Sequence, residues 1–266
     1  MEIKVFLEED IPALEDLQQE EWDDIKPHFL SYVGSAYSFP IQVLDEGKLV
    51  GVGSTIVHGD TAWLGHIIVH SQSRGKGIGK LITNSLIDIA YAHQCKTINL
   101  VATDLGAPVY EKVGFQTTTV YYFFKDVKLP GLVLNGNYIH PYAEQFKEAI
   151  LALDRESSGE DRISELQNHL QSGFVYVEEE QVRGFYLPTL GKGLVIASHP
   201  KAGVELLKLH LKSLDTVVFP KENKVALDFL YANGYKEYHI AKRMALGTER
   251  QVKFENMYNR IGGNVG

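Results

Sequence analysis

A glycine-rich segment flanked by positive charges is the first candidate for chemistry in this chain. The stretch IIVHSQSRGKGIGKLI places residues 74–80 after an apolar run and before a helical pattern. Glycines let backbone N–H groups approach an anion closely, and a helix that begins there adds its unpaired amides and its dipole. We therefore predict a pyrophosphate-binding loop. Its candidate residues are Arg74, Gly75, Lys76, Gly77, Ile78, Gly79 and Lys80.

Two common phosphate-binding motifs do not fit this segment. A P-loop needs Ser or Thr after its lysine, whereas Leu81 follows Lys80. The dinucleotide fingerprint GxGxxG would need its last glycine one position after Gly79. The expected preceding strand is also the third of an antiparallel set, not the first of a βαβ unit. The alternative that stays open is a glycine-rich turn without a ligand.

Composition and charge narrow the class of protein. The 266 residues are 44% hydrophobic and 23% charged, as in ordinary globular proteins. A formal net charge of −8 disfavours a nucleic-acid partner, which needs concentrated Lys and Arg. The single cysteine, Cys95, cannot form an intramolecular disulfide, which fits a reducing cytoplasm. We see no signal peptide, membrane span or metal-ligand spacing, so we predict a cytoplasmic protein without metal.

The first half alternates expected strands and helices around the glycine-rich segment. Three apolar runs joined by short turns predict an antiparallel meander that leads into the loop. Asp10 is predicted to cap the first helix at its N-terminus. The expected strands are 2–7, 40–44, 49–57, 61–70, 96–103 and 117–125, and the expected helices are 8–22, 81–93 and 107–113.

The second half repeats this order of elements. Residues 98–115 and 215–235 each read as a strand, a polar turn, a short helix and a glycine-aromatic pair, although coincidence is an alternative. Prolines and glycines without a clear period mark a join near 127–142. We predict domains at 1–127 and 144–266, with a linker at 128–143. The expected helices are 144–154, 163–170, 204–214 and 224–233, and the expected strands are 174–179, 182–187, 193–198, 216–219 and 236–246.

The glycine-rich segment resembles the RxxGxG loop of the GNAT acyltransferase superfamily, at Arg74, Gly77 and Gly79. A second family motif, NxxAxxLYxKxGF, is similar to residues 103–115, where Thr103 and Gly106 depart from Asn and Ala. The matching residues of that motif are Tyr110, Lys112, Gly114 and Phe115. The resemblance covers the first half and implies that acetyl-CoA is the acyl donor, with its pyrophosphate in the loop.

The resemblance also implies roles for residues on the neighbouring elements. A backbone N–H of the strand before the loop would meet the oxyanion, with Ile67 and Val69 as contacts of acetyl-CoA, and Thr103 would be a further contact. Tyr110 matches the tyrosine that protonates the departing thiolate. A phenol pKa of about 10 lies close to that of a thiol, so the two can share a proton. The alternative for Tyr110 is aromatic packing between a helix and the sheet.

The general base is a separate question, because the strand WLGHIIVH lacks the glutamate that many relatives place there. His66 and His70 are the available titratable groups, and imidazole suits proton transfer near neutral pH. We predict His66 as the catalytic base, acting directly or through water. The alternative is a hydrogen-bonded core histidine.

The second half lacks the parts that the chemistry needs. Leu230 falls where Tyr110 stands, and SHPKAGVELL has no RxxGxG. This half resembles the degenerate repeat of two-domain members of the YitH type. The predicted fold is therefore α+β, with two tandem GNAT-like domains, each a mixed, mostly antiparallel sheet flanked by helices. The second domain would close part of the acceptor pocket or act as a stabilising lid.

The predicted function is N-acetyl transfer from acetyl-CoA to a primary amine of a small molecule or a protein. The retained Tyr110 favours an enzyme over a non-catalytic acyl-CoA-binding regulatory protein, which is the alternative from another class. No nucleic-acid or membrane partner is expected. The amine, the acyl-chain preference and the oligomeric state have no readable pattern in the sequence.

Overall fold

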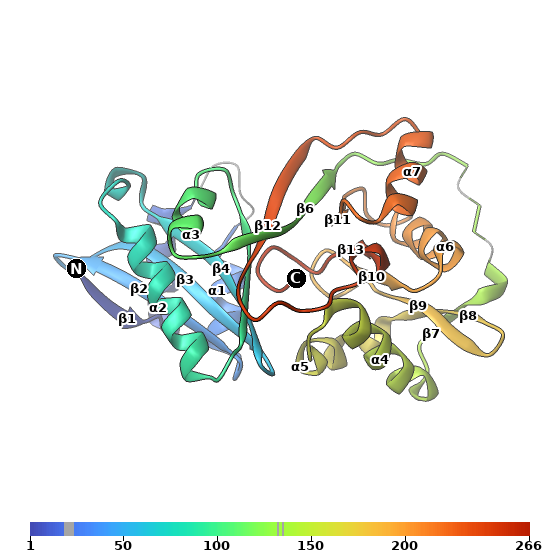
Figure 1. Cartoon of the computed structure of the whole chain (residues 1–266), viewed down its shortest axis with the longest axis horizontal. Helices are drawn as coiled ribbons and strands as arrows, with labels where there is room; N and C mark the ends of the chain where they lie inside the picture. The colour runs from blue at the N-terminus through green and yellow to red at the C-terminus, as the bar shows by residue number, and fades with distance from the viewer. Residues whose placement is uncertain (19–23, 132, 135) are drawn as a thin grey trace. The chain divides into compact units, whose positions relative to one another are not determined.

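The computed structural model describes residues 1–18, 24–131, 133–134 and 136–266 (Figure 1). The chain divides into two compact units, which we call the first unit and the second unit. The first unit comprises Met1–Gln116, Met244–Glu249 and Gly263–Val265. The second unit comprises Thr117–Arg243, Arg250–Gly262 and Gly266. The later chain therefore returns twice to the first unit, which the sequence did not predict.

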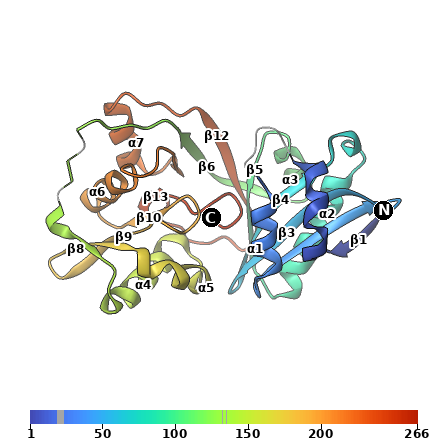
Figure 2. The same ribbon diagram turned by 180° about the vertical axis from the view of Figure 1, so that it is seen from behind.

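The first unit is a sheet with helices on both faces. Its strands pair in the order β1-β2-β3-β4-β5, antiparallel from β1 to β4 and parallel between β4 and β5. Strand β12 (His239–Gly247) follows β5 in strand order, and its residues from Met244 onward belong to the first unit. Figure 1 shows α2 in front of the sheet, and Figure 2 shows α1 in front when the molecule is seen from behind. The elements are β1 Glu2–Val5, η1 Glu8–Leu17, α1 Lys26–Val33, β2 Ser38–Asp45, β3 Lys48–His58, β4 Thr61–Val69, η2 Ser71–Ser73, α2 Ile78–Ala92, β5 Thr97–Ala102 and α3 Ala107–Lys112.

Helix α2 packs closely on the sheet because β3 carries glycine beneath it. A Cβ at Gly51 would lie 2.7 Å from Ile82 Cδ1, and one at Gly53 would lie 2.8 Å from Leu86 Cδ1. Ile82 and Leu86 are fully buried in the core of this unit. Such close packing leaves little freedom of movement, so the positions of α2 and of the loop before it are fixed relative to β3 and β4.

The second unit contains a five-stranded sheet in the order β13-β10-β9-β8-β7, whose resolved pairings are antiparallel. Strands β6 and β11 also pair antiparallel, next to β12 in strand order. The elements are β6 Gln116–Phe124, η3 Gly136–Tyr138, β7 Ile139–Pro141, η4 Glu144–Phe146, α4 Lys147–Ser158, α5 Ile163–Leu166, η5 Gln167–Ser172, β8 Phe174–Glu178, β9 Gln181–Leu187, β10 Leu194–Ala197, α6 Pro200–His210, β11 Val217–Pro220, α7 Lys224–Ala232, β12 His239–Gly247, η6 Phe254–Asn256 and β13 Met257–Asn259.

The mixed α+β fold with helix-flanked sheets is confirmed, and most predicted elements are present. The first helix differs, because Glu8–Leu17 is a 3₁₀ helix with Leu7 at its N-cap. Asp10 lies inside the first turn, where its carboxylate accepts the Leu7 N–H at 2.8 Å, so the predicted cap was wrong. The last part of the predicted helix 8–22 falls outside the described residues. The predicted domain boundaries, 1–127 and 144–266 with a linker at 128–143, stay a prediction.

Candidate active site

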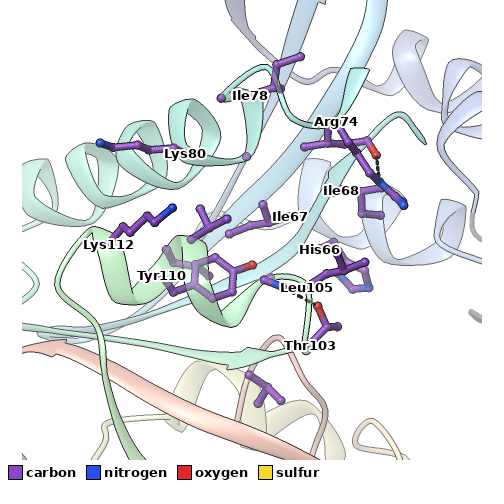
Figure 3. Close-up of a pocket in the computed structure, with 18 of the residues that line it drawn as sticks. His66, Ile67, Ile68, Arg74, Ile78, Lys80, Thr103, Leu105, Tyr110 and Lys112 are labelled. Carbon is purple, nitrogen blue, oxygen red and sulfur yellow. Dashed lines mark hydrogen bonds between the residues drawn. The ribbon is translucent and has the colours of Figure 1, made fainter. Parts of the chain in front are cut away.

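A cavity of about 520 Å³ lies in the first unit, where β4 and β5 stop pairing (Figure 3). The last paired residues are Leu64 and Leu100, although β4 runs on to Val69 and β5 to Ala102. The strands therefore leave an opening between their ends, which helices α2 and α3 border. Residues of β4, β5, α3, the glycine-rich loop and the start of α2 line the cavity, together with Gly263.

The part of β4 that lines the cavity contains a β-bulge. The register pairs Ser54 with Gly65 and Val52 with Ile68, so His66 and Ile67 together face Gly53. The backbone of His66 adopts φ 50°, a left-handed conformation that costs a non-glycine residue free energy. Bulges often re-aim groups at functional sites.

The backbone beyond the bulge offers donors to the cavity. The His70 N–H bonds to Val50 O of β3 at 2.9 Å. Because N–H groups alternate between the two edges of a strand, the Val69 and Ile67 N–H groups face the edge toward β5. That edge has no paired partner here, since the β4–β5 pairing ends at Leu64.

The predicted anion loop opens onto this cavity. Gly75 and Gly77 adopt φ 77° and φ 83°, conformations that favour glycine, and Gly77 is the N-cap of α2. The first intrahelical bond runs from Leu81 N to Gly77 O at 3.0 Å. The preceding amides, of Ile78, Gly79 and Lys80, have no intrahelical acceptor, and the helix dipole adds positive potential there. The helix therefore starts three residues earlier than the predicted residue 81.

Positive side chains surround the same cavity. Arg74, Lys80 and Lys112 line it, and the lining residues that the structure describes include no Asp or Glu. The Arg74 Nε–H donates to Val69 O at 3.3 Å, which ties the loop to the end of β4. Lys76, also predicted as a contact, is exposed and does not line the cavity.

Tyr110 reaches the cavity from α3. Its side chain is 8% exposed, and its ring lies against the backbone of Gly106, where a Cβ would come within 2.8 Å of Tyr110 Cε2. Figure 3 shows the hydroxyl at the end of the ring that is directed away from the helix. Burial raises the pKa of Tyr110 to about 12, so the phenol keeps its proton at neutral pH. Glycine at position 106, a departure from the family motif, thus makes room for this ring.

Thr103 holds the turn that leads into α3. Its Oγ1 accepts the Gly106 N–H at 3.2 Å, and its carbonyl accepts the Gly106 and Ala107 N–H groups at 3.0 and 2.9 Å. Thr103 also lines the cavity, together with Ile67 and Val69. The structure thus places every predicted cofactor contact except Lys76 around one cavity.

His66 lies in the cavity wall but has the properties of a weak base. Burial and the neighbouring His28 lower the pKa of His66 to about 4. The two rings lie 4.6 Å apart between centroids, and the Tyr32 hydroxyl lies 2.7 Å from His66 Nδ1. The imidazole is therefore neutral at physiological pH, and one of its nitrogens is already hydrogen-bonded.

Other titratable residues close to these elements in the sequence do not line the cavity. Asp104 and Glu111 are exposed, and the His70 side chain accepts the Gln72 N–H at 3.3 Å. Cys95 is buried in the core of the first unit, and burial raises the pKa of its thiol to about 11. Among the described residues, no group of three His, Cys, Asp or Glu side chains could hold a metal ion.

The sequence interpretation missed several lining residues and the neighbours of His66. Val101, Leu105, Val109 and Lys112 follow directly from the β5–α3 connection, so the position of Tyr110 could have indicated them. Gly263 and Asn264 had no signal, because Asn264 lies 232 positions after Tyr32, the residue to which it hydrogen-bonds. Only the folded chain brings those positions together.

Residues 4–115 match the acetyltransferase (GNAT) family, which is less than half of the chain. No curated protein matches the sequence. The whole chain is similar in fold to a Pyrococcus horikoshii protein named as an acetyltransferase, at 20% identity and a TM-score of 0.84, covering 100% of this chain and 95% of that one. A GCN5-related N-acetyltransferase from Sphaerobacter thermophilus has 13% identity and a TM-score of 0.65, with 94% and 96% coverage.

A third solved structure, a GCN5-related glucosamine N-acetyltransferase region of a fungal β-N-acetylglucosaminidase, has 14% identity and a TM-score of 0.68. That comparison covers 92% of this chain and 38% of the fungal one. At such low identities these likenesses establish the fold alone. No helix among the described residues combines the length and apolar character that a bilayer span requires. The family match thus concerns residues 4–115, and the similarity of the whole chain to these solved structures concerns its fold.

Proposed function

We propose that the protein transfers an acetyl group from acetyl-CoA to a primary amine of a small molecule or a protein, in the first unit. One observation carries this proposal. The glycine-rich loop, the free amides of α2 and three positive residues line the cavity where β4 and β5 separate. An anion at the mouth of the cavity and an acyl group between the strands suit this arrangement.

The residues at the start of α2 fit a pyrophosphate. A Cβ placed at Gly75 or Gly77 would meet no atom within 4 Å, so both glycines border open space. Unpaired amides at a helix N-terminus together with Arg74 are donors that phosphate oxygens accept. Acetyl-CoA supplies the activated thioester, and the loop residues would fix its position relative to β4.

The end of β4 would stabilise the charge that develops during transfer. Attack of a neutral amine on the thioester carbonyl places negative charge on the carbonyl oxygen. The Val69 and Ile67 N–H groups face this side of β4. Preorganised hydrogen-bond donors to an oxyanion contribute several kcal/mol to catalysis in other enzymes, about 2.7–4 kcal/mol for one side-chain donor. The C–N bond then forms as the C–S bond breaks. The nitrogen gives its surplus proton to solvent water, and Tyr110 recovers from solvent the proton that it gives to the thiolate.

Tyr110 would give its proton to the departing thiolate. The raised pKa keeps the phenol protonated at the pH of the reaction, so Tyr110 holds a proton for the thiolate. The same rise moves the phenol pKa further above that of a thiol, which lowers the driving force for the transfer. The predicted base role of His66 has weaker support. A pKa of about 4 leaves little affinity for the proton of an ammonium group.

The second half would be the degenerate GNAT-like repeat of a two-domain YitH-type protein, without acetyl-CoA binding of its own. Leu230 and the absence of a glycine-rich loop before α6 support that proposal. We further propose a cytoplasmic location, on the single cysteine. The oligomeric state is not part of the proposal.

Thiol release from acetyl-CoA with a panel of primary amines tests the function. We expect amine-dependent release that Tyr110→Phe strongly reduces, while acetyl-CoA affinity stays unchanged. Tight binding without release for every amine, together with an unchanged affinity in Tyr110→Phe, would instead support a non-catalytic acyl-CoA-binding protein.

A further inference from the structure

An arginine of the second unit lies half-buried between aromatic rings without an acidic partner. The guanidinium carbon of Arg260 lies 4.9 Å from the ring centroid of Tyr121 and 5.0 Å from that of Phe123. Among the residues that the structure describes, no Asp or Glu forms an ion pair with Arg260. All three residues belong to the second unit, and none has a role in the function proposed above.

The backbone around Arg260 extends the free edge of β11. The Arg260 N–H donates to Val218 O at 3.0 Å, and the Val218 N–H donates to Asn259 Oδ1 at 2.8 Å. Val218 pairs with Phe123 of β6, and Tyr121 lies two residues before Phe123 on the same face of that strand. The Arg260 side chain therefore reaches across β11 to two rings of β6, which limit the positions that its guanidinium can take.

A cation that is withdrawn from water without a counter-ion is unfavourable for the folded state. Burial lowers the pKa of Arg260 to about 10, and the groups that partly oppose this change are the phenols of Tyr121 and Tyr238, not carboxylates. The faces of aromatic rings attract a cation, but they do not replace the hydrogen-bond acceptors that a guanidinium needs. The folded chain therefore keeps an arginine whose charge and donors are only partly satisfied.

The guanidinium of Arg260 has one buried and one open side. Nη1 is buried without a hydrogen-bond partner, whereas Nε and Nη2 are not enclosed in this way and make no hydrogen bond to a described residue. Nε and Nη2 are therefore open to solvent, and together they match the two oxygens of a carboxylate. Tyr238 is 56% exposed and its ring centroid lies 6.4 Å from that of Phe123, so a ligand here would also find aromatic surface.

We propose that Arg260 is the anion-binding residue of a site for a small carboxylate, with the rings of Phe123 and Tyr238 beside it. A single arginine suits a monoanion, and the pairing would consist of two parallel hydrogen bonds from Nε and Nη2. The ligand would supply the counter-ion that the described residues do not provide. The site lies in the second unit and its test needs no acetyl-CoA, so its outcome does not depend on the proposed acetyl transfer.

The test is a titration of the full chain with benzoate, followed on the arginine Nε–H signals in NMR spectra. The Arg260→Met variant identifies the Arg260 signal. Benzamide has nearly the same shape without the charge, and inorganic phosphate supplies a different anion. We expect benzoate to shift the Arg260 signal to saturation with a Kd on the order of 1 mM, and benzamide to bind at least about tenfold more weakly. A shift that does not saturate, equal binding of benzamide, or tighter binding of phosphate than of benzoate would overturn the proposal.

Two substitutions at the same position separate charge from geometry. Arg260→Lys keeps the charge but loses the planar pair of donors, so we expect benzoate affinity to fall about tenfold, measured on backbone amide signals. Arg260→Met should lose benzoate binding altogether. The control is Arg155→Met, because Arg155 is exposed and pairs with Asp161 at 3.5 Å, and its benzoate affinity should equal that of the wild type. Wild-type affinity in either Arg260 variant would place the bound benzoate elsewhere and overturn the proposal.

Denaturation distinguishes a binding residue from one that stabilises the fold. Methionine keeps apolar contact with the two rings and removes the uncompensated charge, so we expect Arg260→Met to unfold at a midpoint equal to or above that of the wild type. Saturating benzoate should raise the midpoint of the wild type and leave that of Arg260→Met unchanged. A lower midpoint in Arg260→Met without ligand would show that Arg260 stabilises the fold, and it would overturn the proposal.

Discussion

Each unit has a strand that leads into a long helix, β4 into α2 in the first unit and β10 into α6 in the second. The two strands differ in what lies beside them. Strand β4 has no pairing with β5 beyond Leu64, and the opening is the cavity. Strand β10 keeps an antiparallel partner, β13, through Val195 with Asn259 and Ile196 with Met257. A segment of the chain itself therefore occupies this edge of β10, whereas the corresponding edge of β4 borders the cavity.

The first turns of the two helices differ in the same way. A Cβ at Gly79 of α2 would lie 3.8 Å from Val69 Cγ2, an ordinary contact that leaves the space beyond it open. A Cβ at Gly203 of α6 would lie 2.0 Å from the ring of Tyr258, which is 2% exposed. A glycine in each helix thus serves a different purpose: one borders a cavity, and the other accommodates an aromatic ring.

The short helices that follow are alike in their backbone. Thr103 Oγ1 accepts Gly106 N–H at 3.2 Å, and Asn223 Oδ1 accepts Ala226 N–H at 2.9 Å. Phe115 N–H donates to Tyr110 O, and Tyr235 N–H donates to Leu230 O, both at 3.0 Å. These shared bonds support the repeat proposal and place Leu230 at the counterpart of Tyr110. The comparison shows that the two units share these backbone bonds and differ in how the space beside the strand is filled and in one side chain.

The largest effect on stability is expected at Tyr258, whose ring fills the space over Gly203 in the second unit. Tyr258→Ala removes a buried ring over Gly203 and should lower the free energy of unfolding by about 3–5 kcal/mol, as large aromatic truncations do. Chemical denaturation measures it, and Tyr258→Phe is the control, which should cost far less. Because α6 begins with Pro200 and has no glycine-rich loop, the variant should still bind one acetyl-CoA per chain. A stoichiometry of two would contradict this account of the difference between the units.

The next effect concerns Gly79 in the first turn of α2, where the space beside the glycine is open. Gly79 has no positive φ and room for a Cβ, so Gly79→Leu should fold normally and fill only the ligand space. We expect acetyl-CoA affinity to fall about 10²-fold or more, which calorimetry can measure. The control is His199→Leu at the exposed N-cap of α6, whose side chain makes no capping bond. Wild-type affinity in Gly79→Leu would remove the loop from the binding site.

Tyr110→Phe tests the difference between Tyr110 of α3 and Leu230 of α7. We expect kcat to fall about 10²-fold, in the range of general acid–base contributions, with acetyl-CoA affinity unchanged. Thiol release and calorimetry on the same preparation measure both quantities. Tyr91→Phe is the matched control, because Tyr91 lies on α2 and is 50% exposed. An equal loss of affinity and kcat would mean that Tyr110 packs against the ligand and gives no proton.

These contrasts show how far sequence reasoning reaches. The glycine-rich loop, the meander and Tyr110 were predictable, because each depends on local spacing and on residue types with few conformational options. The first helix was predicted wrongly at Asp10, because a carboxylate can satisfy the Leu7 N–H from inside the turn as well as from the cap. Strand β13 and the Asn264–Tyr32 bond were beyond reach, since contacts between distant positions leave no periodic pattern.

The smallest effect concerns His66, the half-buried histidine of the first unit's cavity wall. Its pKa of about 4 lies below the ordinary 6.5, so below pH 6.5 the unfolded chain takes up a proton that the folded chain refuses until about pH 4. Stability that is complete above pH 6.5 should therefore decline between pH 6.5 and 4, by about 1 kcal/mol at pH 5 for a partly exposed ring.

Chemical denaturation at pH 7 and pH 5 compares His66→Gln with the wild type, and the exposed His199→Gln is the control. We expect His66→Gln alone to show a smaller decline. The second unit contributes a decline of the same sign in all three proteins, because burial also lowers the pKa of His210, whose Nε2 lies 2.8 Å from Thr216 O. Identical declines in His66→Gln and the wild type would mean that His66 titrates as an ordinary surface histidine. Of the two histidines, only His210 would then contribute to the decline.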